Sequence, residues 1–582
     1  MSARSKAELY PFHASNIHED RFVARFARAV PLLLFLGNAV CVGCFLAWRR
    51  DLLFWLAALL NVSLWMWLMR LAVHSVLGML FPSRASAWHW GSKRPTGLGK
   101  DVTHIVVLPN YKEEEALLAQ TLRSLAETQD AQTLRVILAM EKREGGVGLE
   151  KAERLKERFG RSVAEIIIAL HPDDLTQTHC DGSMTAEVAG KASNLKWAVA
   201  TAHQRMCTDQ SINPEDVVVT VADADCLLHP SYFAHVTQEF IALRKSGDHL
   251  RSMWQAPQLP FRNYFESPAP SRIWGYVSSL FEFGGVASLS SGGQHMLFSA
   301  YSVPLTMAVN AEMWDGDVIT EDHHAYLKAF FFSLRESALA TCNAAEGKAA
   351  EATAPKRHPL RLLPVLLPVK STSVASSKGN LHGWCDRWQQ AKRHAQGVAE
   401  LSYAVLATLD LIASLPFSAW GIEMIMSLVK VFGRLLCIHI LPTCQILAVA
   451  ALAIHWYVLG LSRPECESIG TPPVNFLGSN SISMLRFWSS SHETISCLTV
   501  NRAYALLLTL PALAMASIAL TNYLFLSKSF LGCPADETLK DKLWTMQRGG
   551  VKPLLGSKRL SMALLVTVDC LLLAGPIMAL YG

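Results

Sequence analysis

The stretch "EDVVVTVADADC", residues 215–226, combines a buried strand with a pair of acids. Its run VVVTV holds only β-branched residues and shows no polar alternation, which is typical of a strand covered on both faces. Asp223 and Asp225 follow directly, one residue apart, at the position where such a strand ends. Ligands of parallel α/β sheets bind beyond the carboxyl ends of the strands, so this position predicts a functional site.

Three similar strands precede this one. The segments 103–111, 134–141 and 163–170 are rich in aliphatic and β-branched residues. Helical patterns separate them, at "EEEALLAQTLRSLAET", at 149–159 and at 190–205. Near-continuous apolar strands that alternate with helices predict an α/β domain with a doubly wound, mostly parallel sheet.

The composition indicates membrane segments as well. Of the 582 residues, 51% are apolar and 17% are charged, against about 25% charged residues in typical soluble proteins. The formal charge of +5 is small for this length and gives no indication of nucleic-acid binding. The thirteen cysteines follow no disulfide-like spacing, so we expect mostly reduced thiols.

Five apolar runs are close to the length of about 20 residues that a helix needs to cross a bilayer. They are 30–48, 52–69, 436–461, 503–526 and 560–581. The segment 401–430 contains Asp410, Pro416 and Glu423. It could lie in the membrane interface, re-enter the membrane or span it. The predicted organisation is a cytosolic N-terminal segment, a transmembrane hairpin, a cytosolic α/β domain inserted between transmembrane helices, interfacial or re-entrant helices, and a C-terminal transmembrane region: 1–29, 30–70, 98–397, 398–435 and 436–582.

Basic residues predict the orientation, because cytosolic loops carry an excess of Lys and Arg. They cluster before the first run, after the second run and in the 527–559 linker, whereas 462–501 holds fewer. We therefore expect the α/β domain to face the cytosol. The residues concerned are Arg21, Arg25, Arg28, Arg70, Arg84, Lys93, Arg94, Lys100, Lys528, Lys540, Lys542, Arg548, Lys552, Lys558 and Arg559.

The acids after the 215–226 strand predict a cation site. Asp223 and Asp225 repel one another unless a cation lies between them, and oxygen ligands suit Mg²⁺ or Mn²⁺ carrying a diphosphate. Lys191, in "AGKASNLKWA", stands where a helix begins and can offer its ammonium group to phosphate. Taken alone, a solvated lysine is the better interpretation.

A second pair of acids opens the helical stretch "VITEDHHAYLKAFF", residues 318–331. Glu321 and Asp322 at a helix N-terminus stabilise the helix whatever else they do, so a capping role is one interpretation. His323 and His324 point about 100° apart on a helix and cannot easily share one metal ion, which favours a structural role. Farther on, Gln390 and Arg393 share one face of a helix.

Taken in order, five motifs resemble those of processive-type glycosyltransferases of family 2, the membrane group that includes cellulose and hyaluronan synthases. They are "LPNYKE" at 108–113, "GKASNL" at 190–195, "DAD" at 223–225, "TED" at 320–322 and "QAKRH" at 390–394. The resemblance covers roughly residues 30–526. The stretch "FSAYSVPLTMAV…WDGDVITEDHHAYLKAFF" is similar to a eukaryotic microbial subgroup of glycosyltransferase family 2-like proteins.

The resemblance implies a GT-A fold and an inverting, metal-dependent transfer of a sugar from a nucleotide sugar, a UDP-sugar, to a hydroxyl of a glycan or lipid acceptor. Asp322 would be the general base, with Glu321 beside it, and Asp225 with Asp223 would hold Mg²⁺ or Mn²⁺. Gln390 and Arg393 would hold the leaving diphosphate. The nucleotide-sugar site would comprise Pro109, Tyr111, Glu113, Glu141, Lys191, Asn194 and Asp223.

The chain departs from that family in three places. His394 replaces the tryptophan that usually faces an acceptor sugar, which weakens the case for long polymers, and Trp388 would face the acceptor or anchor the membrane interface. Glu141 stands where an acidic pair is usual. An Ala-rich segment, 338–355, is expected to form a surface loop.

Three functions remain open: synthesis of a polysaccharide, transfer of a single sugar to a lipid or short acceptor, and an inert membrane scaffold or transporter. The expected location is an integral, multi-pass membrane protein of the Golgi, endoplasmic reticulum or plasma membrane, in contact with membrane lipid and without nucleic-acid partners.

Overall fold

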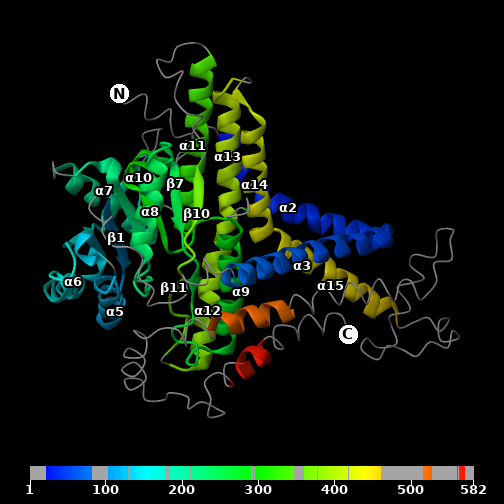
Figure 1. Cartoon of the computed structure of the whole chain (residues 1–582). Helices are drawn as coiled ribbons and strands as arrows, with labels where there is room; N and C mark the ends of the chain where they lie inside the picture. The colour runs from blue at the N-terminus through cyan, green and yellow to red at the C-terminus, as the bar shows by residue number, and fades with distance from the viewer. Residues whose placement is uncertain are drawn as a thin grey trace.

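The computed structural model contains a mixed α/β domain and a set of long apolar helices that project from it (Figure 1). The described residues are 21–80, 102–128, 130–178, 184–208, 212–289, 293, 295–316, 318–345, 360–376, 378–416, 419–460, 515–526, 560 and 563–569. Most of the basic residues that predict orientation, the 462–501 loop and most of 560–581 lie outside them.

The central sheet has seven strands in the order β10-β7-β9-β6-β1-β2-β3. Its strands are β1 (Thr103–Asn110), β2 (Leu134–Glu141), β3 (Glu165–His171), β6 (Val217–Val221), β7 (Ser252–Gln255), β9 (Tyr301–Pro304) and β10 (Arg361–Pro364). Only β9 runs against its neighbours β6 and β7, and the other pairs are parallel. The predicted mostly parallel sheet is therefore confirmed.

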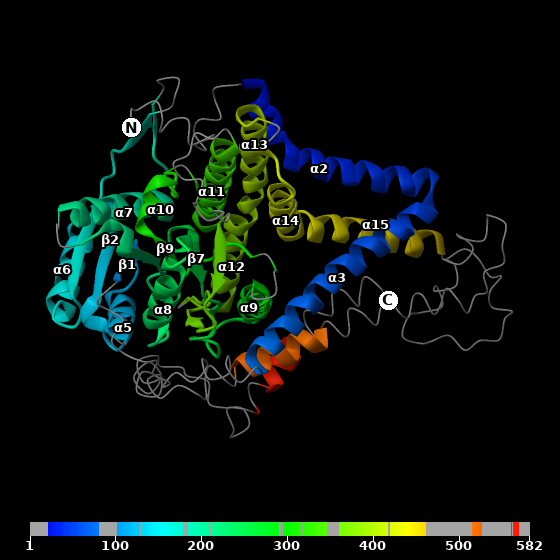
Figure 2. The same cartoon turned by 45° about the horizontal axis from the view of Figure 1, so that its top comes forward.

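Helices cover both faces of the sheet, because alternate residues of each buried strand point to opposite sides. Ile105 and Val107 of β1 pack toward α7 (Lys191–Thr208) and α10 (Leu305–Asn310). Val106 and Leu108 pack toward α5 (Glu115–Ala126), α6 (Gly146–Phe159) and α8 (Tyr232–Arg244). Figure 2 shows these layers beside the sheet. The short pairs are β4 (Thr176–Thr178) with β5 (Met184–Ala186), and β8 (Gln258–Leu259) with β11 (Val369–Lys370).

Two long helices connect the α/β domain with the apolar helices. α11 (Glu321–Ala345) begins at the predicted acids and packs against α13 (Ala399–Ser414). α9 (Ala269–Leu289) packs against α3 (Arg50–Leu80). At that contact a Cβ on Gly284 would lie 2.4 Å from the backbone oxygen of Leu71, so glycine is what lets the two backbones approach.

Within the described ranges, three helical stretches are long and apolar enough to cross a membrane: Arg25–Trp48, Trp55–Met79 and Asn380–Ser414. The first two lie in α2 (Arg21–Trp48) and α3, as the sequence predicts, and the third combines α12 (Asn380–Ala395) with α13. A bent pair, Ile422–His439 with Leu441–Ala451, would be a fourth if counted as one span. The helix Met515–Leu526 is shorter.

Two sequence-based expectations are wrong in their bounds. The run 436–461 is not one helix, because α14 (Ile422–His439) ends before α15 (Leu441–Gly460), with a 49° bend between them. Pro442 in the first turn of α15 explains the break, since proline starts helices but cannot continue one. The expected loop 338–355 is helical as far as Ala345, in keeping with the high helix propensity of alanine.

Candidate functional site

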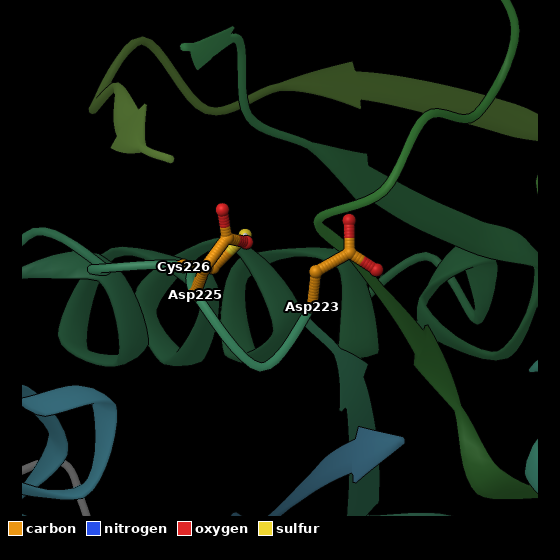
Figure 3. A group of neighbouring side chains, drawn as sticks. All are labelled: Asp223, Asp225 and Cys226. Carbon is orange, nitrogen blue, oxygen red and sulfur yellow. The ribbon is translucent and has the colours of Figure 1, made fainter. Parts of the chain in front are cut away.

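The acids after β6 form the first part of the candidate site (Figure 3). One ligand atom each from Asp223, Asp225 and Cys226 lie within 4.8 Å of one another. The Asp225 carboxylate accepts hydrogen bonds from the Thr372 N–H, at 2.8 Å, and from the Thr372 hydroxyl. Burial and the nearby charge of Asp223 raise the pKa of Asp225, so a cation beside the pair would be favoured.

This donor set fits a hard divalent cation. Two carboxylates suit Mg²⁺ or Mn²⁺, which also accept ligands from phosphate and water. Burial raises the pKa of the Cys226 thiol well above its usual range, and sulfur is a softer ligand than Mg²⁺ or Mn²⁺ favours. Asp223 and Asp225 are therefore the residues that would hold the ion.

Lys191 joins two distant parts of the chain. Its Nζ lies 2.7 Å from Asp223 Oδ1, after β6, and 2.7 Å from Glu321 Oε1, in the first turn of α11. Burial alone would lower the pKa of Lys191, but the two carboxylates outweigh it and hold that pKa well above the usual range. Lys191 therefore stays protonated, and its ammonium group lies between the two pairs of acids.

The two acids of α11 differ in exposure. Glu321 is buried, whereas Asp322 is half-buried and accepts a hydrogen bond from the His323 N–H at 3.3 Å. Burial raises the pKa of both carboxyl groups, that of Glu321 to about 8, and the charge of Asp223 adds to the effect. Asp322 is thus the more accessible of two carboxyl groups with a raised affinity for a proton.

Glu282 of α9 is a further member of this acidic cluster that the sequence analysis missed. Its carboxylate accepts hydrogen bonds from the Gln258 N–H at 2.7 Å and from the Ser278 hydroxyl at 3.3 Å. Burial raises the pKa of Glu282 to about 8, with contributions from Asp322 and Asp223. The available signal was a single acid in an otherwise apolar and small-residue helix.

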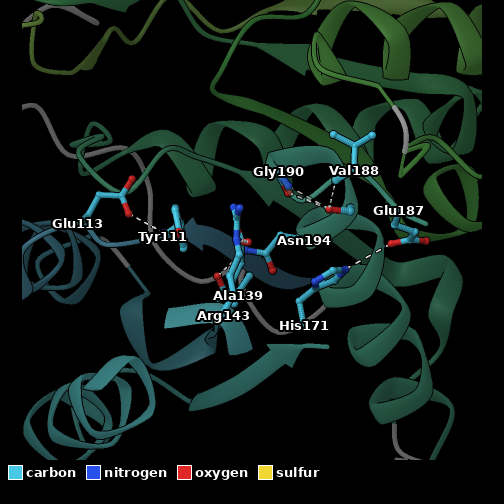
Figure 4. Close-up of polar contacts among 11 residues, drawn as sticks. Tyr111, Glu113, Ala139, Arg143, His171, Glu187, Val188, Gly190 and Asn194 are labelled. Atoms are coloured by element: carbon cyan, nitrogen blue, oxygen red, sulfur yellow. Dashed lines mark hydrogen bonds and ion pairs between the residues drawn. The ribbon is translucent and has the colours of Figure 1, made fainter. Parts of the chain in front are cut away.

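A second polar group lies at the carboxyl ends of β1 and β2 (Figure 4). The Arg143 guanidinium lies 3.7 Å from the centre of the Tyr111 ring and forms an ion pair with Glu141. Glu113 accepts a hydrogen bond from the Tyr111 N–H at 2.6 Å, and burial raises the pKa of Glu113. The predicted residues Tyr111, Glu113 and Glu141 are thus adjacent, with Arg143 as an unpredicted neighbour.

Two other predicted nucleotide-site residues are tied into the sheet. The Asn194 amide donates a hydrogen bond to the Ala139 carbonyl at 2.7 Å, and Pro109 is buried in β1 opposite Ala139. Beside them, Glu187 accepts from Lys196 at 2.8 Å and lies 3.4 Å from His171, a pair that the sequence analysis did not single out. Asn194 and Pro109 therefore position this end of the sheet.

The four predicted residues of α12 have contacts of their own. Gln390 accepts a hydrogen bond from Arg387, and His394 lies 5.4 Å, ring to ring, from Trp274 of α9. Arg393 is exposed, as is 66% of Trp388. Within the part of the chain that the structure describes, no hydrogen bond or ion pair joins these four to the acidic cluster. Their roles at the diphosphate and the acceptor stay predictions.

The two histidines of α11 have separate surroundings. His324 lies 2.9 Å from both Asp315 and Glu400, and Lys328 lies 2.6 Å from Asp315, all fully buried. Burial would lower the pKa of His324, but the two carboxylates raise it to about 9, so the imidazole is charged. His323 instead packs 4.9 Å, ring to ring, from Phe298. Their contacts are those of structural residues.

No protein-family model matches the chain, and no curated protein sequence does. Among solved structures, it is similar to the mannosyltransferase PcManGT from Pyrobaculum calidifontis in complex with GDP-Man and Mn²⁺. The two share 14% identity, and the match covers 80% of this chain and 98% of that one, with a TM-score of 0.35. Overlap this distant assigns no family and no activity to the chain.

Proposed function

We propose that the protein is a membrane glycosyltransferase that moves a sugar from a nucleotide sugar to a hydroxyl acceptor with inversion at the sugar. The observation that carries the proposal is Lys191, which links the acids after β6 to the acids that open α11. This link supports the proposal because it brings the acids of the proposed cation site and the proposed base into one cluster at the carboxyl edge of a mostly parallel sheet. Scaffold and transporter functions have no need of such an arrangement.

In this proposal, the nucleotide and the diphosphate are bound by different residues of the site. A nucleotide would lie along the ends of β1 and β2, with its base near the Tyr111 ring and Arg143. Asp223 and Asp225 would hold Mg²⁺ or Mn²⁺, which when bound neutralises charge on the leaving diphosphate. The Lys191 ammonium forms an ion pair with Asp223. When a diphosphate enters, Lys191 can turn to its oxygens, since a lysine is a flexible point charge.

Asp322 would accept the proton of the attacking hydroxyl. Its raised pKa makes it a stronger base than an ordinary aspartate, and it is the more exposed acid of the α11 pair. A hydroxyl that attacks from the face opposite the leaving group, helped by one carboxylate, inverts the anomeric centre. Glu321 and Glu282 lie deeper in the cluster and hold its charge and shape.

The test is turnover by purified full-length protein in detergent or nanodiscs, with a panel of UDP- and GDP-sugars and with Mg²⁺ or Mn²⁺. We expect metal-dependent release of nucleoside diphosphate in the native protein, and its loss in Asp322→Asn and Asp225→Ala. Glu150→Gln, an exposed acid on α6, is the matched control and should keep full activity. Turnover that persists in Asp322→Asn would remove the base from the proposal.

Product length separates the two transferase functions. A ladder of products from a labelled nucleotide sugar indicates a polysaccharide synthase, and one discrete product indicates transfer to a lipid or short acceptor. A native protein that neither binds nor turns over any nucleotide sugar would leave only the inert scaffold or transporter.

A further inference from the structure

Arg434 of α14 is a buried cation with no carboxylate partner in the part of the chain that the structure describes. Its side chain is 8% exposed, and none of the described residues forms an ion pair with it. The guanidinium lies 4.4 Å from the centre of the Phe281 ring, in α9, and 5.5 Å from the centre of the Trp67 ring, in α3. Side chains of both helices therefore cover it. A buried unpaired charge costs several kcal/mol, so this position calls for a counter-charge.

The hydrogen bonding around Arg434 points to an anion. Arg434 Nη2 donates to His295 Nδ1 at 3.1 Å, while Arg434 Nε has no acceptor among the described residues. Burial and the charge of Arg434 hold the pKa of His295 well below its usual range, so the imidazole is neutral. Because its Nδ1 accepts, its Nε2 carries the proton, and that buried donor also has no described acceptor.

The glycine at position 285 allows His295 to lie beside Arg434. A Cβ on Gly285 would lie 2.1 Å from His295 Nδ1, so a side chain there would push the imidazole away from Arg434. Arg70 of α3 also lies close enough to interact electrostatically with Arg434. We name Arg434, His295 and Arg70 the basic cluster; it is positive, buried at its centre and short of acceptors.

A row of aromatic rings connects the basic cluster to the acidic cluster. His295 lies 5.0 Å from Phe298, ring to ring, and Phe298 lies 4.9 Å from His323, the residue next to Asp322. The faces of such rings are large apolar surfaces, against which the C–H groups of a sugar ring can pack. An acceptor whose anion reaches Arg434 would therefore have its sugar beside the rings and its hydroxyl toward Asp322.

The surroundings favour a lipid as the source of the anion. α3 and α14 belong to the stretches that are apolar enough to enter a membrane. Their outer faces expose large apolar side chains, among them Met66, Val73, Ile425, Met426 and Val429. An anionic head group attached to an apolar chain would find a charge partner inside and an apolar surface outside.

We propose that Arg434 and His295 bind the phosphate of a membrane-embedded acceptor lipid. This inference rests on the proposed function for the identity of the ligand as the acceptor, although the phosphate site itself can be tested without any transfer. A planar guanidinium and an imidazole N–H together match the oxygens of a phosphate ester.

The experiment measures binding of a labelled long-chain polyisoprenyl phosphate to the full-length protein in phosphatidylcholine nanodiscs. The neutral polyisoprenol and inorganic phosphate serve as competitors. We expect the phosphate lipid to bind at least about tenfold more tightly than the alcohol, and Arg434→Gln to abolish this difference. Arg335→Gln is the control, because Arg335 is also largely buried but has a carboxylate partner, Asp410, at 3.2 Å.

A second variant guards against misfolding. Gly285→Ala leaves Arg434 in place but displaces His295, and we expect it to weaken binding of the phosphate lipid while the thermal unfolding of the protein stays cooperative. Equal binding of lipid phosphate and alcohol by the native protein would overturn the proposal, as would an unchanged preference in Arg434→Gln. Inorganic phosphate that binds as tightly as the lipid would show a site for free phosphate instead.

Nucleotide-sugar binding is measured on the same samples to separate the two proposals. Lipid phosphate binding without nucleotide-sugar binding would support the phosphate site and contradict the glycosyltransferase. Nucleotide-sugar turnover with no preference for the phosphate lipid would support the glycosyltransferase and contradict the phosphate site.

Discussion

The first turns of α11 take part in two groups of charged residues with opposite balance. In the network around His324, two carboxylates, Asp315 and Glu400, face two cations, His324 and Lys328, and all four are buried. In the acidic cluster around Asp322, the carboxylates outnumber the cation Lys191, and part of the cluster is open to solvent. The balanced group holds the helix in place, whereas the unbalanced group is suited to bind a cation and accept a proton.

This difference is visible in the pKa values. In the balanced network the carboxylates raise the pKa of His324 to about 9, so opposite charges support one another. In the acidic cluster burial and like charges raise the pKa of Glu321 and of Glu282 to about 8. The paired charges around His324 stabilise the fold. The excess of carboxylates around Asp322 perturbs their pKa values, which is typical of functional sites.

The largest expected effect comes from removing the proposed base. Asp322→Asn keeps the size and hydrogen bonding of the side chain but cannot take up a proton, so we expect the turnover number to fall about a thousandfold. Nucleotide-sugar affinity should change little, and this is measured by equilibrium binding. A loss of binding together with turnover would instead assign Asp322 to the donor site.

The next effect is a loss of stability in the balanced network. Lys328→Met leaves the buried Asp315 with one cation fewer, and we expect the free energy of unfolding to drop by about 3–5 kcal/mol. Arg154→Met, which removes an exposed ion pair with Glu115, should cost less than about 1 kcal/mol. Similar losses in denaturant unfolding of the two variants would contradict the contrast between buried and exposed pairs.

The balanced network also predicts a pH dependence of stability. The pKa of His324 is about 9 in the folded protein and about 6.5 when unfolded, so the folded state binds the proton more tightly. Its contribution, on the order of 3 kcal/mol, is present below pH 6.5 and is lost as the pH rises toward 9. Thermal unfolding as a function of pH measures it, and His324→Gln should reduce the slope in this window. The raised pKa values of Glu321 and Glu282 account for the slope that remains below pH 8.

The smallest effect concerns the cation. Asp225→Asn weakens one ligand, and we expect the Mn²⁺ concentration for half-maximal turnover to rise about tenfold. Cys226→Ser should leave it unchanged, because sulfur is a soft ligand that Mg²⁺ and Mn²⁺ do not favour. A large shift in the cysteine variant would make the sulfur a ligand and would change the expected preference from Mg²⁺ or Mn²⁺ to a softer metal.

Local patterns predicted the strands and the acids at their ends. β1, β2, β3 and β6 lie where β-branched runs indicated them, and α7 and α11 begin at Lys191 and Glu321. These features depend on short stretches of sequence, where periodicity and helix-start signals act directly. The proximity of Lys191 to both acid pairs was predicted only through the resemblance.

Long-range partners could not be predicted in this way. Glu282 joins the acids only because α9 packs against β8, and Glu400 meets His324 only because α13 packs on α11. In the sequence, Arg434 is an ordinary basic residue of an amphipathic stretch. Only the structure shows that it is buried between α3 and α9. No window of a few residues contains both partners of these contacts.

The glycine contact between α9 and α3 affects how the protein can be prepared. Gly284 sits against the backbone of Leu71, two residues from Glu282. A truncated form that lacks residues 21–80 would expose this face of α9, including Phe283, which is fully buried in the intact chain. We expect such a fragment to aggregate and to lose the arrangement around Glu282, so a water-soluble catalytic piece is not obtained by cutting away the N-terminal hairpin.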